Sequence, residues 1–226
     1  MANPTLRDFV GEKVWHDLLE RAFDRWHPAR TVLMRQGEPG THVLAVRSGV
    51  AKVLRAERNG ELTVLAFRGH GELLGEIAVI GGGGRLAGVE TLTRACVAVI
   101  NKPDFLRFVT EHDLSPALTR YALARLSESD RARSCGDVLQ RLAAVLVHVA
   151  EISRDPADGG GDADRGHEPI ELALTRQELA QYLRTSRNTV TAHLGALAAH
   201  GVRAGRGRVV VADLPALRRV AVALES

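Results

Sequence analysis

The segment from Leu174 to Leu197 constrains the fold more than any other part of the chain. Thr175 stands three residues before Glu178, which is the spacing of a capping box at the start of a helix. Ser186 is a second N-capping residue and can open another short helix. Two short capped helices joined by a turn at residues 184–185 predict a helix-turn-helix motif.

The second of these helices carries polar side chains in its first turns, where such a motif faces the major groove of DNA. The residues predicted to read bases are Arg187, Asn188 and Thr191. A guanidinium can donate two hydrogen bonds to guanine and an amide can pair with adenine, each worth about 1–3 kcal/mol of discrimination. The hydroxyls, amides and helix-start N–H groups predicted to hold phosphates belong to Thr175, Arg176, Gln177, Ser186 and Thr189.

Basic residues gather in the same part of the chain. Residues 170–226 contain eight Arg and four acidic residues, a net charge of +4, whereas the remainder carries −1. Residues 202–212 predict a hairpin with Arg203, Arg206 and Arg208 near its turn, which would form the wing of a winged helix-turn-helix. The alternative, a helix pair used only for packing, explains neither the polar helix face nor the basic wing. The predicted partner is therefore double-stranded DNA.

The N-terminal half follows a different pattern. Short apolar or alternating segments are separated by Gly-bearing turns, which predicts an antiparallel sandwich or barrel. A helix is expected before these segments, over residues 12–26, because apolar residues recur there at spacings of three and four. The predicted strands cover residues 31–34, 42–47, 51–56, 62–67 and 97–100.

A long helical stretch follows the predicted strands. After a short helix over 104–111, residues 113–154 are predicted to be helical, with a hinge near Cys135-Gly136 and with Asp137 capping the second part. Residues 155–168 hold five acidic residues and four glycines, and are expected to be a solvated loop.

The predicted fold class is α+β. An N-terminal antiparallel β-roll, jelly-roll-like, would span residues 1–112, a long central dimerisation helix with its hinge 113–136, and a C-terminal winged helix-turn-helix domain 137–226. A helix longer than its own domain needs can pair with a second copy of itself, so a homodimer is expected.

Other classes of protein are disfavoured by composition. No apolar run approaches the roughly 18 residues of a membrane span, and the N-terminal residues lack the apolar stretch of a secretory signal, so a cytoplasmic protein is expected. Cys96 and Cys135 form no CxxC pair, and the nine histidines include no His-x-His pair of the kind that metal-dependent barrel enzymes use. Neither a metal site nor an enzyme is expected.

The chain resembles the Crp/Fnr family of bacterial transcription regulators over almost its entire length. The resemblance implies a cyclic-nucleotide-binding-like roll and a homodimer that binds DNA and contacts RNA polymerase. Asn188 and Ala192 stand where members typically have Glu and Arg, so a different preferred DNA sequence is expected. The residues that carry the resemblance are 35–40 (RQGEPG), 44–49, 71–78 (GELLGEIA), 85–87 (RLA) and the helix-turn-helix.

The resemblance also implies a pocket inside the roll, with cAMP or cGMP as candidate effectors. Glu76 matches the glutamate that accepts a hydrogen bond from the ribose, and Arg85 matches the arginine that pairs with the cyclic phosphate. Leu86 departs from the family pattern, because it replaces a Ser or Thr whose hydroxyl contacts the phosphate. The full candidate set is Gly75, Glu76, Arg85, Leu86, Ala87 and Ser127.

Several alternatives stay open beside a cyclic nucleotide. The roll could sense another ligand or none, and an adaptor without DNA function is a further alternative, against which the basic wing argues. An iron–sulfur sensor needs an N-terminal cysteine cluster, and no cysteine precedes Cys96. Haem ligation by His42 or His70, and a thiol switch at either cysteine, have no supporting pattern.

Overall fold

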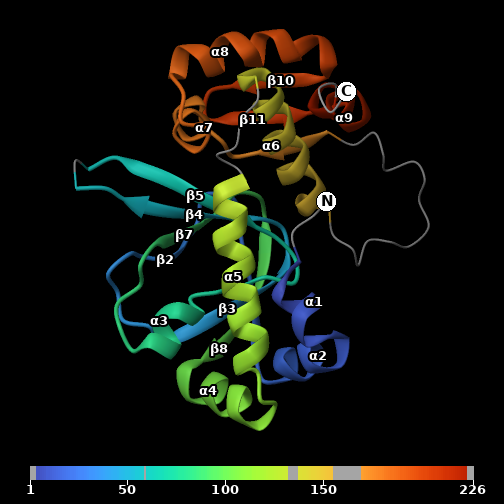
Figure 1. Ribbon diagram of the computed structural model, residues 1–226. Helices are drawn as coiled ribbons and strands as arrows, with labels where there is room; N and C mark the ends of the chain where they lie inside the picture. The colour runs from blue at the N-terminus through green and yellow to red at the C-terminus, as the bar shows by residue number, and fades with distance from the viewer. Residues whose placement is uncertain (1–3, 59, 132–136, 155–168, 223–226) are drawn as a thin grey trace.

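The computed structural model describes residues 4–58, 60–131, 137–154 and 169–222, with the side chains of 127–131 left out of the description. Figure 1 shows an N-terminal lobe of antiparallel sheet and a C-terminal lobe with a helix-turn-helix. The predicted α+β fold class is confirmed. The predictions for the hinge at Cys135-Gly136 and for the acidic segment 155–168 lie outside the described residues.

The N-terminal lobe is a roll of two antiparallel four-stranded sheets, with strand orders β1-β8-β3-β6 and β2-β7-β4-β5. Alternation along β3 turns Leu44 and Val46 into the space between the sheets, where they pack with Val89 of the other sheet, and turns Val43 and Ala45 outward onto the flanking helices. The strands are β1 Phe23–His27, β2 Val32–Met34, β3 His42–Ser48, β4 Ala51–Ala56, β5 Leu62–Arg68, β6 Leu73–Leu74, β7 Gly88–Thr91 and β8 Ala95–Asn101.

Four short helices flank the roll: α1 Leu6–Val10, α2 Glu12–Glu20, α3 Glu76–Gly81 and α4 Lys102–Glu111. The helix predicted over 12–26 is wrong beyond Glu20. Trp15 is buried in α2, but Trp26 lies on β1 opposite Cys96 and is 58% exposed. The helical spacing of apolar residues therefore continued into an edge strand, where backbone pairing with β8 decides the structure.

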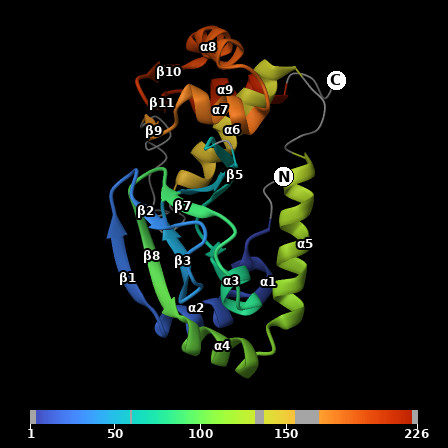
Figure 2. The same cartoon turned by 90° about the vertical axis from the view of Figure 1, so that its left-hand side faces the viewer.

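Two longer helices follow the roll, α5 Ser115–Arg131 and α6 Val138–Ser153. Figure 2 shows α5 standing along one side of the roll. Its inner face buries Ala117, Leu118 and Tyr121. Asp137 occupies the N-cap position of α6 as predicted, but its side chain makes no capping hydrogen bond.

The C-terminal lobe is the predicted winged helix-turn-helix. It comprises α7 Arg176–Leu183, α8 Arg187–Ala196, a 3-10 turn over Leu197–His200, β10 Val202–Gly205, β11 Arg208–Val211 and α9 Leu214–Val222. Both predicted caps form, because the Thr175 hydroxyl accepts from the Glu178 N–H at 3.1 Å and Ser186 accepts from the Thr189 N–H at 3.0 Å. A third strand, β9 Ile170–Leu172, pairs with β11 and was not predicted.

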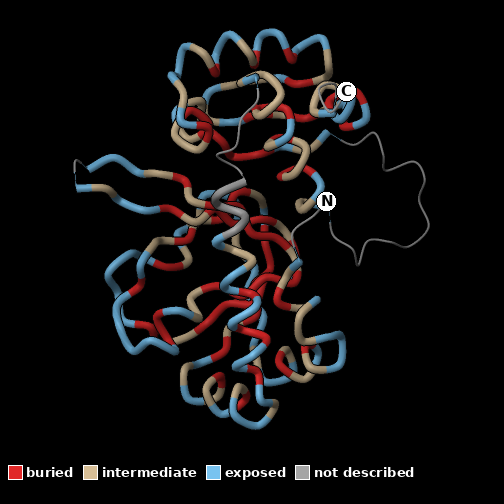
Figure 3. The backbone as a smooth tube through the Cα atoms, in the orientation of Figure 1, coloured by how far each residue is buried: buried red, intermediate tan, exposed pale blue. Residues whose placement is uncertain are grey.

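The two lobes share one buried cluster, visible in Figure 3 as buried segments on both sides of their junction. Val50, Leu54 and Phe67 of the roll pack into the same core as the aliphatic side chains of the C-terminal lobe. The Phe67 and Tyr182 rings lie 5.0 Å apart, and the Ala173 N–H donates to the Leu92 carbonyl at 3.1 Å. The C-terminal lobe thus rests on β4 and β5.

Candidate nucleic-acid interface and ligand pocket

The first turns of α8 present the residues predicted to read bases. Arg187, Asn188 and Thr191 are all exposed, while Val190 and Leu194 on the opposite face are buried. Figure 1 places α8 along the outer edge of the C-terminal lobe, on the side away from the roll. The helix therefore offers a polar face that a groove of DNA can cover.

The turn between the two helices is tight. Arg184 ends α7 in the left-handed conformation, with φ 52° and ψ 51°, and the Thr185 N–H donates to the Ala180 carbonyl at 2.9 Å. A side chain costs about 1 kcal/mol in this conformation, which glycine adopts freely. Ala180 and Val190, one on each helix of the motif, are both buried.

The residues predicted to hold phosphates do not all face solvent. Gln177 and Ser186 are exposed, whereas Thr175, Arg176 and Thr189 are half-buried. The start of α7 faces the roll, because the Glu178 carboxylate of its capping box forms an ion pair with Lys52 of β4.

The wing is the hairpin of β10 and β11, closed by a two-residue turn in which Gly207 has φ 73°. Arg203 and Arg206 are exposed. Arg208 is also exposed but lies 3.4 Å from the Glu171 carboxylate, which neutralises part of its charge. The Gly207 carbonyl accepts a hydrogen bond from Arg30, so the wing turn also touches the roll.

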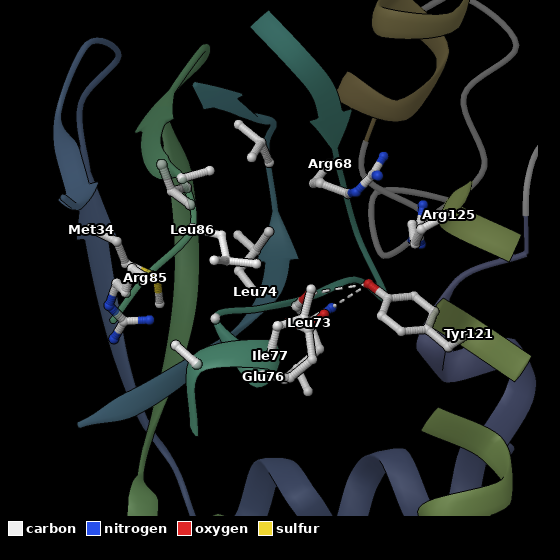
Figure 4. A pocket seen from close by; sticks show the side chains of 15 residues that line it. Met34, Arg68, Leu73, Leu74, Glu76, Ile77, Arg85, Leu86, Tyr121 and Arg125 are labelled. Carbon is white, nitrogen blue, oxygen red and sulfur yellow. Dashed lines mark hydrogen bonds between the residues drawn. The ribbon is translucent and has the colours of Figure 1, made fainter. Parts of the chain in front are cut away.

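The roll contains a cavity of about 180 Å³, shown in Figure 4. Five of the six predicted ligand residues line it, namely Gly75, Glu76, Arg85, Leu86 and Ala87. Ser127 lies on α5, but its side chain is outside the described part of the chain. The remaining walls are mostly apolar and include Met34, Val53, Leu73, Leu74, Ile77, Ala78 and Val89.

Three arginines, Arg68, Arg85 and Arg125, line this pocket, and Arg85 is 4% exposed. Its Nη2 donates to the His42 carbonyl at 2.9 Å, and its buried Nη1 has no hydrogen-bond partner among the described residues. Nη1 lies where a Cβ on Gly75 would stand, and Gly75 has φ 87°, so only glycine suits that position. A buried guanidinium with a free N–H is an anion-binding group.

Glu76 begins α3 and lines the same pocket. Burial raises the pKa of its carboxyl to about 7, although Arg125 and Arg68 pull it downward. Near neutral pH the group is therefore divided between its charged and protonated forms, and the protonated form can donate a hydrogen bond to a ligand.

A buried polar network ties α5 to the floor of the pocket. The Tyr121 hydroxyl donates to the Glu72 carboxylate at 2.6 Å and accepts from the Leu73 N–H at 3.3 Å, and Arg125 forms an ion pair with Glu72. Burial raises the pKa of Glu72. Sequence reasoning missed this network, since nothing in the pattern marks Glu72 as buried.

The pocket meets the cyclic-nucleotide pattern only in part. It holds the guanidinium and the carboxyl, but Leu86, which is 67% exposed, supplies no hydroxyl for a phosphate. The described residues thus do not complete a cyclic-phosphate site.

The chain combines a roll that contains a pocket, a long helix and a winged helix-turn-helix. This combination defines a two-domain transcription regulator. The cyclic nucleotide-binding domain model matches residues 24–112, and the Crp-like helix-turn-helix domain model matches residues 140–220. The chain belongs to the Crp/Fnr family, and the resemblance found in the sequence is confirmed.

Known relatives span nearly the whole chain. It is 27% identical to the cyclic AMP receptor protein of Thermus thermophilus, over 95% of this chain and 99% of the relative. The structure of the c-di-GMP responsive global regulator CLP of Xanthomonas campestris is 26% identical, with a TM-score of 0.58 over 88% of this chain and 98% of that one. A CRP-family transcriptional regulator from Thermus thermophilus shares the fold, with a TM-score of 0.64 at 20% identity over 87% of this chain and 96% of that one.

These relatives are transcription regulators and not enzymes. Among the described residues, no helix is both long and apolar enough to cross a membrane.

Proposed function

We propose that this chain is a sequence-specific, DNA-binding transcription regulator that acts as a homodimer and responds to a small ligand in the roll. The observation that carries the DNA-binding proposal is the exposed polar face of α8, with Arg187, Asn188 and Thr191 in its first turns. The exposed Arg203 and Arg206 of the wing add a basic surface beside it. Family resemblance alone supports a contact with RNA polymerase.

The outer face of α5 supports the homodimer. Leu123 and Leu126 are 58% and 66% exposed on the side opposite the buried Leu118 and Tyr121. A second copy of α5 packed against this face would remove both leucines from water. Such a pair would also set two α8 helices for successive turns of one duplex, about 34 Å apart.

Selection of bound duplexes from a random pool tests this function directly. We expect enrichment of a two-fold symmetric site whose half-sites are one helical turn apart, together with a dimeric mass in light scattering. A monomeric mass, or a pool that stays random in dilute buffer, would contradict the proposal.

Arg85 supports an anionic effector, and the apolar walls support an uncharged body attached to that anion. The cyclic nucleotides cAMP and cGMP are the candidates that the family suggests.

Titration calorimetry with cAMP and cGMP separates the effector proposals. Saturable heat that disappears in Arg85→Ala would assign a cyclic nucleotide to the pocket. Titrations without heat for both nucleotides would exclude them, and would leave a different small anion or a ligand-independent regulator.

A further inference from the structure

Strands β4 and β7 separate the pocket from the C-terminal lobe. In their antiparallel register Lys52 pairs with Glu90 and Val53 pairs with Val89. Val53 and Val89 line the pocket. Because side chains alternate along a strand, Lys52 and Glu90 point to the opposite face.

On that opposite face, Lys52 joins the two lobes. Its side chain is 4% exposed, and its Nζ lies 2.9 Å from the Glu90 carboxylate and in an ion pair with Glu178. Glu178 is the capping-box residue of α7, where its carboxylate also accepts from the Thr175 N–H at 2.8 Å. The ammonium therefore binds the start of the first helix of the helix-turn-helix.

Lys52, Glu90 and Glu178 form an ion triad whose central ammonium is buried. A buried ammonium persists only when its charge is compensated, and without it the two half-buried carboxylates would repel each other. Removing one partner of such a triad is expected to separate the groups, and with them the two lobes.

The roll also contacts two segments of the C-terminal lobe that are predicted to lie near phosphates. The start of α7 is held by the triad, and the wing turn is held through the Gly207 carbonyl and Arg30. Both contacts are made within one subunit. Thr175 and Arg176, which are predicted to hold phosphates, are half-buried at this contact.

We propose that the Lys52–Glu90–Glu178 triad is an interdomain clamp that holds the C-terminal lobe against the roll and thereby restrains DNA binding. The clamp sits directly behind the pocket wall formed by Val53 and Val89, so a change in the pocket has a two-strand path to the helix-turn-helix. This inference rests on the proposed DNA-binding function.

The test uses the full chain and a duplex enriched in the selection experiment, at one fixed salt concentration. Lys52→Met should bind this duplex at least about fivefold more tightly than the wild type, which is the lower end of typical allosteric coupling. Arg55→Met is the matched control, since Arg55 lies on the same strand but pairs with Glu57 of the roll. It removes the same charge and should leave affinity unchanged.

If Lys52→Met folds poorly, Glu178→Gln tests the same ion pair from its other side. Glutamine keeps the capping box, so α7 remains capped while the ion pair with Lys52 is lost. Its affinity for the duplex should also rise. Hydrogen exchange gives an independent measurement, because the Ala173 amide donates across the junction to Leu92 and should exchange faster in both clamp variants than in Arg55→Met.

Slow exchange of the Ala173 amide in both clamp variants would show that the triad does not hold the lobes together, and would overturn the proposal. Faster exchange without tighter DNA binding would overturn it as well, because the clamp would then not restrain binding. If the wild type and every variant failed to bind any duplex, the proposed function itself would be wrong.

Discussion

Arg187 and Asn188 are both exposed in the first turn of α8. Substituting either one alone can therefore test its predicted contact with a base. Arg187→Ala should weaken binding to the preferred site by about 1–3 kcal/mol and relax the preference at one base position. Arg206→Ala on the wing is the comparison. It should lower affinity evenly across sequences and reduce the salt slope by about one. Repeating the duplex selection with both variants checks this, and an unchanged base preference in Arg187→Ala would contradict the reading role.

Leu86 makes a second prediction at the same scale. If the absent hydroxyl limits cyclic-nucleotide binding, Leu86→Ser should tighten the binding of cAMP or cGMP by about tenfold, since a hydrogen bond to a charged group contributes about 1.5 kcal/mol. Calorimetry measures this against Leu86→Ala, which removes the side chain without adding a hydroxyl. Equal affinities in the two variants would show that the hydroxyl is not what the pocket lacks.

Glu76 adds a pH dependence. Its folded-state pKa of about 7 lies above the ordinary value of 4.5, so this carboxyl stabilises the fold least when it is ionised. Its contribution is fully present below pH 4.5 and is lost as the pH rises through 7. Glu76→Gln should therefore gain stability relative to the wild type between pH 5 and 8, by up to about 3 kcal/mol. Urea unfolding at several pH values measures the difference, which should vanish near pH 4.

How far the sequence determines the site differs from residue to residue. The positions of Glu76 and Arg85 follow from their motif, and the structure brings both to the pocket. The half-burial of Arg176 and the ion pair of Arg208 with Glu171 were not predictable, because both depend on segments far away in the sequence. Local pattern fixes which face a side chain takes, but not what another element brings against it.

At the scale of elements, the strained end of α7 makes a prediction. Arg184 holds the left-handed conformation at a cost that glycine avoids, so Arg184→Gly should stabilise the chain by about 0.5–1 kcal/mol. Arg184→Ala is the control, since it removes the charge but keeps the strain. In thermal unfolding, the midpoint temperature should rise by at most about 2–4 °C in Arg184→Gly and should not rise in Arg184→Ala. A lower midpoint for glycine would mean that the Arg184 side chain contributes more than the strain costs.

Elements were predictable where local signals agree. The caps at Thr175 and Ser186 mark both helices of the motif, and both form. The predicted helix over 12–26 failed because periodicity alone does not distinguish a covering helix from an edge strand with exposed aromatic rings. The short strand β9 failed for the opposite reason, since three residues carry too little pattern to recognise.

At the scale of the whole molecule, the sequence predicts two modules but not how they meet. Val50, Leu54 and Phe67 have the alternation of ordinary strand residues, and nothing marks them as part of a core shared with the C-terminal lobe. Lys52 likewise looks like a solvated residue of a strand until Glu178 is placed beside it. Docking between modules depends on surfaces that are complementary only in three dimensions.

The shared core has a consequence for cooperativity. Both tryptophans, Trp15 and Trp26, belong to the roll, so fluorescence emission follows the melting of that lobe, whereas far-ultraviolet circular dichroism follows helices of both. Superimposable denaturation curves from the two probes are expected, because lobes that share a core should melt as a single unit. In Lys52→Met the curves from the two probes should separate, because the two lobes would then unfold independently.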